Sequence, residues 1–111
     1  MIPFLLQIAG ETQENSPVYI RFDKAKGSVN GFSGCNRFFG NFHNQDDYIK
    51  FNQLASTRMA CAEAHKNKLE QEFLAILRDE LLRFDVADQT LNIYKDDKLL
   101  LMFGLGPLEA L

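Results

Sequence analysis

The sequence predicts an α+β domain, in which one helix packs on a curved, mainly antiparallel sheet of half-barrel form. Three observations predict this fold class. Most of the 111-residue chain alternates apolar and polar residues, which is typical of half-buried strands. One segment, residues 62–81, instead spaces its apolar residues by three and four, as an amphipathic helix does. Short polar turns separate the strand-like segments, so consecutive strands are expected to form hairpins.

The strand predictions rest on this alternation. In residues 18–23, Val18, Ile20 and Phe22 fall on one face and polar or charged residues dominate the other. The same pattern predicts strands at residues 4–8, 28–32, 38–42, 48–52, 82–87, 91–94 and 99–103. We expect turns in the polar segments 23–27, 43–47 and 95–98. So many strands in a short chain favour a curved or partly closed sheet, because closure hides strand edges.

The helix prediction rests on a stripe of apolar side chains. The stripe consists of Leu69, Phe73, Ile76, Leu77 and Leu81. Asn67 followed by Glu70 resembles a capping box, with Asn in place of Ser or Thr. This signal predicts a helix start near Lys68, and an earlier start near Ala62 is the alternative.

Composition limits the classes of function. The net charge is −3, and basic residues alternate with acidic ones along the chain. A nucleic-acid-binding domain usually carries a basic face, so we expect no nucleic-acid partner. No apolar run approaches the roughly 18 residues of a transmembrane helix. The ten phenylalanines can stabilise a small core, since burying one contributes roughly 1.5–3 kcal/mol.

The ends of the chain bear on domain organisation and localisation. We expect one monomeric domain over residues 1–105 and a frayed tail over residues 106–111. The apolar start, residues 1–6, lacks a basic segment and a small-residue cleavage site, so we do not expect a signal peptide there. Either the protein is cytosolic or the chain begins after a removed signal. The cysteine pair favours the second alternative.

Three hypotheses account for Cys35 and Cys61, the two cysteines of the chain. A disulfide is favoured; it would indicate an oxidising compartment and contribute about 3–4 kcal/mol to stability. Two reduced, buried thiols are the alternative. A reactive thiol or a metal site is the third hypothesis. Zinc needs about four ligands, and His43 and His65 lack metal-site spacing, so we expect no metal or cofactor. His65 lies four residues after Cys61 and is the nearest candidate base for a thiol nucleophile.

Four polar residues flank the cysteines: Asn36, Arg37, Thr57 and Arg58. They are a candidate binding motif, because arginine offers a planar fork for anions and carboxylates. The alternative role is structural, since Asn and Thr side chains bond to nearby backbone and arginine packs its aliphatic stem. We favour the structural role and expect no catalytic residues.

The two phrases GCNRFFG (residues 34–40) and STRMAC (residues 56–61) closely resemble those of the META domain, or HslJ-like, family. The helix with Phe73 and Leu77, the last two strands and the first strand also match, although a Trp frequent in the first strand is missing. The resemblance covers nearly the whole chain. It implies a half-barrel-like fold with one helix, similar to the pilotins that chaperone secretins, and a disulfide between Cys35 and Cys61.

The resemblance also has implications for function. Family members are often bacterial envelope lipoproteins linked to heat shock, motility or antibiotic resistance, and no agreed catalytic activity comes with the family. The leading hypothesis is a non-enzymatic domain of the periplasm or outer membrane that binds a protein, peptide or lipid partner. A lipid anchor ahead of this chain would tether it to the membrane. The alternatives are a redox or hydrolytic enzyme that uses Cys35 or Cys61, and a purely structural domain.

Overall fold

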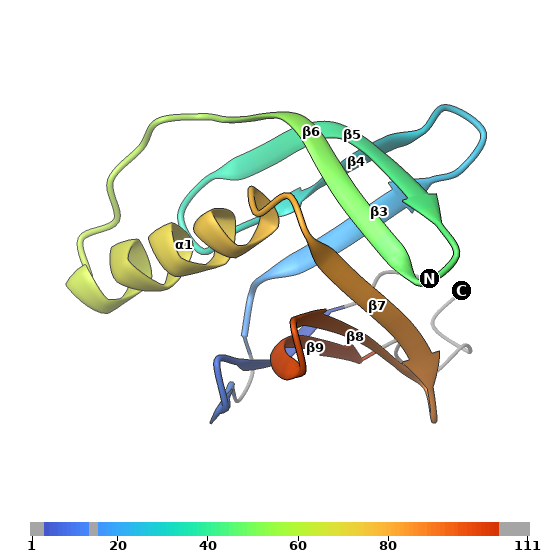
Figure 1. The fold of residues 1–111 in the computed structure, drawn as a ribbon. Helices are drawn as coiled ribbons and strands as arrows, with labels where there is room; N and C mark the ends of the chain where they lie inside the picture. Colours follow the sequence, from blue (N-terminus) through green and yellow to red (C-terminus); the bar gives the residue numbers. More distant parts are fainter. Residues whose placement is uncertain (1–3, 14–15, 105–111) are drawn as a thin grey trace.

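A computed structural model describes residues 4–13 and 16–104. The predicted tail, residues 106–111, lies outside these described residues. Figure 1 shows a strongly curved sheet with one helix. The elements follow in chain order: β1 (Phe4–Ile8), β2 (Glu11–Thr12), β3 (Tyr19–Asp23), β4 (Ser28–Phe32), β5 (Arg37–Gln45), β6 (Tyr48–Ser56), α1 (Ala64–Leu77), β7 (Leu82–Ala87), β8 (Thr90–Lys95) and β9 (Lys98–Gly104).

The strands form one antiparallel sheet that bends into a ring. Its order is β2-β1-β3-β4-β5-β6-β7-β8-β9, and an additional pairing of β1 with β9 brings its two ends together. The ring is not a true barrel, because β6 and β7 pair only at Tyr48 with Arg83 and at Ile49 with Leu82. Only the first two residues of each strand take part, so the two strands are offset along their length and the rest of each has no partner in the other. The predicted fold class, an antiparallel curved sheet with one helix, is therefore confirmed.

Helix α1 closes one end of the ring with its apolar face. The fully buried Phe73 packs edge-on between Phe38 of β5 and Phe103 of β9, with ring centroids 5.6 and 6.1 Å apart. Leu74 and Leu77, one and four residues further along the helix, are buried as well. The apolar stripe of the sequence thus joins strands from distant parts of the chain into one core.

Three local predictions differ from the structure. The helix ends at Leu77, so Leu81 of the predicted stripe lies beyond it and is exposed. The helix begins at Ala64, and its N-cap residue Glu63 makes no side-chain cap bond, so the capping box that Asn67 and Glu70 predicted is wrong. Both residues lie inside the helix, where their side chains have other partners. The predicted turn at residues 43–47 is shorter than expected. Asp46 takes a positive φ of 54°, and β5 continues to Gln45 because its polar side chains face solvent.

No helix among the described residues has both the length and the apolar character needed to span a membrane.

Candidate functional site

The two cysteine-containing segments meet at one corner of the domain. The structure joins Cys35 and Cys61 by a disulfide across a sequence separation of 26 residues, with their Cα atoms 5.6 Å apart. The bridge links the loop between β4 and β5 to the segment that enters α1. A structural disulfide indicates an oxidising, extracytoplasmic compartment.

Glu70, on the side of α1 that faces this corner, organises the loop between β4 and β5. Its Oε1 atom accepts hydrogen bonds from the Ser33 hydroxyl at 2.6 Å, the Cys35 N–H at 3.1 Å and the Asn36 N–H at 2.7 Å. Its Oε2 atom accepts a bond from Asn36 Nδ2 at 2.7 Å. One carboxylate therefore satisfies four donors of a tight loop. Bonds of this kind to a charged acceptor are stronger than neutral ones.

The surroundings of Glu70 act on its pKa in opposite directions. Partial burial is the largest single influence and raises the pKa, but the bonds from Ser33, Asn36 and Cys35 lower it and together prevail. The net result is a pKa below the ordinary value of 4.5. Glu70 is accordingly a stable carboxylate at neutral pH, suited to hold the loop rather than to transfer a proton.

Asn36 connects this loop to the segment after β6. Its Oδ1 atom accepts bonds from the Thr57 hydroxyl at 2.9 Å and the Met59 N–H at 2.6 Å. Its Nδ2 group donates to the Met59 carbonyl at 2.9 Å as well as to Glu70. Since Asn36 is only 4% exposed and its amide is fully engaged, it holds protein structure together and is not free to bind a ligand.

Asn67 holds the other side of the disulfide. Its side chain accepts a bond from the Cys61 N–H at 3.1 Å and donates one to the Cys61 carbonyl at 3.0 Å. The structure therefore defines a polar corner made of Ser33, Asn36, Thr57, Asn67 and Glu70 around the Cys35–Cys61 bridge. Neither Glu70 nor Asn67 could be recognised in this role from the sequence, because their local spacing resembles a helix cap.

The structure separates the four predicted motif residues into two pairs. Asn36 and Thr57 contact each other inside the polar corner. Arg37 and Arg58 are exposed, and no salt bridge of either is found among the described residues. Arg58 borders a hollow of about 680 Å³ between the end of β6 and α1.

The end of the ring that α1 does not close is open and apolar. We call it the mouth; it encloses about 280 Å³ and is lined mainly by Phe22, Phe42, Ile49, Phe84, Val86 and Leu91. Phe22 and Phe42 meet edge to face with centroids 5.0 Å apart. Val86, in the strand β7 that borders the mouth, is 59% exposed. Lys24 and Asn44 complete the lining with polar atoms.

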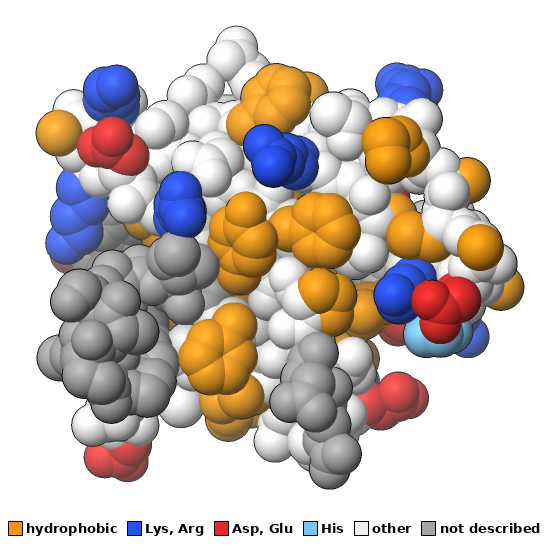
Figure 2. Space-filling model, turned by 180° about the vertical axis from the view of Figure 1, so that it is seen from behind, with side chains coloured by type: hydrophobic (Ala, Val, Ile, Leu, Met, Phe, Trp, Pro, Cys, Tyr) orange, Lys and Arg blue, Asp and Glu red, His pale blue; other side chains and the backbone are white. Residues whose placement is uncertain are grey.

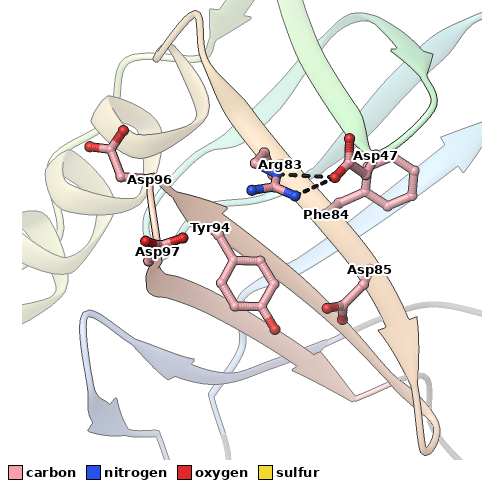
Figure 3. A pocket seen from close by; sticks show the side chains of 7 residues that line it. All are labelled: Asp47, Arg83, Phe84, Asp85, Tyr94, Asp96 and Asp97. Atoms are coloured by element: carbon pink, nitrogen blue, oxygen red, sulfur yellow. Dashed lines mark hydrogen bonds and ion pairs between the residues drawn. The ribbon is translucent and has the colours of Figure 1, made fainter.

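A third hollow lies beside the mouth and is acidic. Figure 3 shows Arg83 and Asp47 pointing toward each other in it, with Asp85, Asp96 and Asp97 nearby. Arg83 donates two bonds to Asp47, and these bonds lower the pKa of Asp47. Within the described ranges, no group of three or more His, Cys, Asp or Glu side chains is arranged to hold a metal ion.

The rear of the molecule also carries hydrophobic side chains, which gather on its surface between scattered charged residues (Figure 2). Phe4 and Phe39 are among the exposed large apolar residues of the described chain. Such residues are common singly on protein surfaces. The mouth differs because its aromatic rings converge on one hollow.

Comparisons with known proteins support one family. The model of the META domain family matches residues 5–105. A search of curated proteins finds no significant match. One similar solved structure, determined by NMR, has a TM-score of 0.76 and 26% identity, covering 96% of this chain and 90% of the other. An NMR structure of a protein from Burkholderia xenovorans has a TM-score of 0.68 and 25% identity, covering 93% of this chain and 78% of the other.

Proposed function

The chain belongs to the META domain family, and we propose that it is a non-enzymatic domain of the bacterial envelope that binds a partner protein through its apolar mouth. One observation carries the proposal. Inward-facing side chains of β3, β5 and β7 are buried elsewhere along these strands, as at Ile20, Phe38 and Leu82, but stay accessible to solvent at this end. Converging apolar side chains of this kind accept the anchor residues of a partner protein.

The chemistry of the described residues favours binding over catalysis. The cysteines are joined to each other, so neither is a thiolate available for redox or hydrolytic chemistry. The Ser33 hydroxyl is fully buried and donates to Glu70, which removes it from contact with a substrate. His65 is exposed on the first turn of α1, and its Nε2 atom lies 3.7 Å from Oε2 of Glu63. It makes no hydrogen bond to any nucleophile described above.

The disulfide supports placement outside the cytoplasm, in the periplasm or at the outer membrane, where the partner would be another envelope protein. Lipid acyl chains could also enter an apolar hollow. Two features favour a protein over a lipid. The volume of the mouth is small, about 280 Å³. Its Phe, Val and Leu side chains form a shallow surface that suits one or two partner side chains.

Site-specific photo-crosslinking in the bacterial envelope tests this function. A photo-crosslinking amino acid is placed at Val86, in the mouth, and in a matched variant at Leu81, which is 65% exposed and outside the mouth. We expect a specific crosslinked protein from position 86 and none from position 81. The partner, once purified, should bind Val86→Asp at least about ten-fold more weakly than Leu81→Asp. Equal crosslinking from both positions would refute the mouth as the binding site, and none from either would support a purely structural domain.

A further inference from the structure

Strand β6 has an unpaired edge on the side away from β5. Its pairing with β7 ends at Ile49. Among the described residues, no backbone hydrogen bond joins residues 50–56 to any element other than β5. Natural proteins usually protect such an edge, because its free N–H and C=O groups attract other strands. Helix α1 faces this edge across the hollow that Arg58 borders, and the edge itself is not covered by another strand of the described chain.

The register of β6 shows which backbone groups are free. Ala55 pairs with Phe39 of β5, and the Thr57 N–H donates to the Arg37 carbonyl at 3.0 Å. Backbone groups of successive residues in a strand point to alternate edges. Those of Leu54 and Ser56 therefore point toward α1. Gln53 has a positive φ of 53° at the β-bulge between β5 and β6, so the usable edge begins after it.

The hollow between this edge and α1 has the form of a peptide groove. Leu54 and Ser56 border it on one side, and Gln71 and Leu74 of α1 border it on the other. It holds about 680 Å³. Its helical wall, from Asn67 to Arg78, is about 16 Å long at 1.5 Å per residue. That length accommodates roughly four or five residues of an extended strand.

The charges around the groove favour an acidic occupant. Arg58 follows the free edge and Arg78 caps the C-terminal end of α1, and both border the groove. Neither forms a salt bridge with a described residue. The carboxylate in the lining, Glu70, is already bonded to four donors of the polar corner. The groove therefore offers two cations that form no salt bridge with a described residue, together with apolar lining at Leu54 and Leu74.

We propose that an extended acidic segment of a partner protein adds to β6 as a further strand, between β6 and α1. Its backbone pairs with Leu54 and Ser56, an apolar side chain rests on Leu54 and Leu74, and its carboxylates contact Arg58 and Arg78. Backbone pairing supplies affinity in this mode of recognition, while the pockets and charges supply specificity. The groove lies away from the mouth, so this proposal does not depend on the proposed function of the mouth.

The test uses a random octapeptide library displayed on phage, selected against the oxidised protein. We expect enrichment of sequences that combine apolar residues with Asp or Glu. Binding of a selected peptide should fall at least ten-fold in R58E/R78E and be unchanged in Arg37→Glu, a control that reverses an exposed charge outside the groove. Val86→Asp should also leave binding unchanged, which separates this site from the mouth.

A second measurement tests the backbone pairing itself. Ser56→Pro removes an N–H that points into the groove and should abolish peptide binding while the protein stays folded. Ala55→Pro removes an N–H that belongs to the ladder with β5 and should instead lower the melting temperature. Amide exchange at Leu54 and Ser56 should slow when the peptide binds. Failure to enrich any peptide, enrichment without acidic residues, or undiminished binding by Ser56→Pro would each overturn the proposal. Dimerisation through β6 in place of peptide binding would overturn it too.

Discussion

The substitution Glu70→Gln tests the polar corner. The glutamine carbonyl can keep the position of Oε1, but its three bonds lose the contribution of the negative charge. The amide nitrogen takes the place of Oε2 and meets Asn36 Nδ2, 2.7 Å away in the native protein, where two donors then face each other. A hydrogen bond to a charged group contributes about 1.5–3 kcal/mol and a neutral one about 0.5–1.5 kcal/mol.

Glu70 is only partly buried, so water offsets some of this loss. We expect the free energy of unfolding to fall by about 2 kcal/mol, because the charge is lost from three bonds and the fourth becomes unfavourable. In urea this corresponds to a midpoint lower by about 1 M. The measurement is equilibrium unfolding of the oxidised protein, with the disulfide intact in both states. Glu72→Gln is the matched control, because Glu72 is an exposed carboxylate on the same helix.

The pH dependence of the free energy of unfolding provides a second measurement in the same experiment. The pKa of Glu70 in the folded protein lies below 4.5, so the charge stabilises the protein above that pH. This contribution disappears as the pH falls through the folded-state pKa. The difference between wild type and Glu70→Gln should therefore shrink below pH 4.5. A constant difference from pH 7 to pH 3, or equal stability of Glu70→Gln and Glu72→Gln, would refute the role assigned to Glu70.

Three further predictions concern the bridge and the core. Replacing both Cys35 and Cys61 by Ser should lower the free energy of unfolding by about 3.5 kcal/mol, the value for a closed loop of this length, measured by urea unfolding. Gly31→Ala should cost about 2–3 kcal/mol by the same assay, because a Cβ atom would lie 2.8 Å from the Phe38 ring and clash with a neighbouring carbonyl. Phe73→Ala should cost about 3–5 kcal/mol and lower the thermal midpoint, since it removes the aromatic contact between α1 and the sheet.

Control substitutions show whether these losses of stability are specific to the chosen positions. Asn30→Ala, at an exposed position next to Gly31 on β4, should change stability by less than about 0.5 kcal/mol. Ile76→Ala, at a partly buried position of α1, should cost less than Phe73→Ala. If the cysteine double variant unfolds at the same urea concentration as the oxidised wild type, the bridge does not stabilise the folded state.

The pattern of the sequence was sufficient to predict the sheet, because a strand's two faces meet different environments. Phe22 and Phe42 fall on the inner face by alternation alone. The same alternation does not distinguish Phe22 and Phe42, which lie at the open end of the ring, from Phe38, which is covered by α1. That distinction depends on where one helix lies relative to several strands. The position of the mouth could therefore not be predicted from the sequence.

The polar corner could be predicted only in part. The sequence favoured a structural role for Asn36, Arg37, Thr57 and Arg58, and in the structure Asn36 and Thr57 bond to each other in the corner. Glu70 remained hidden because it bonds to residues more than thirty positions away, and nothing in its local spacing separates a helix cap from a long-range acceptor. Arg58 was grouped with these residues by sequence, but its side chain belongs to the groove.

The polar corner and the groove are physically connected. Asn36 bonds both the N–H and the carbonyl of Met59, and the disulfide holds Cys61 two residues later. Together these contacts fix the path by which the chain leaves β6 and enters α1. Since that path forms one end of the groove, the corner sets the spacing between the free edge of β6 and the helix. Asn36 and Glu70 would therefore influence a segment bound in the proposed groove without contacting it, because they hold the strand edge and the helix at a fixed spacing.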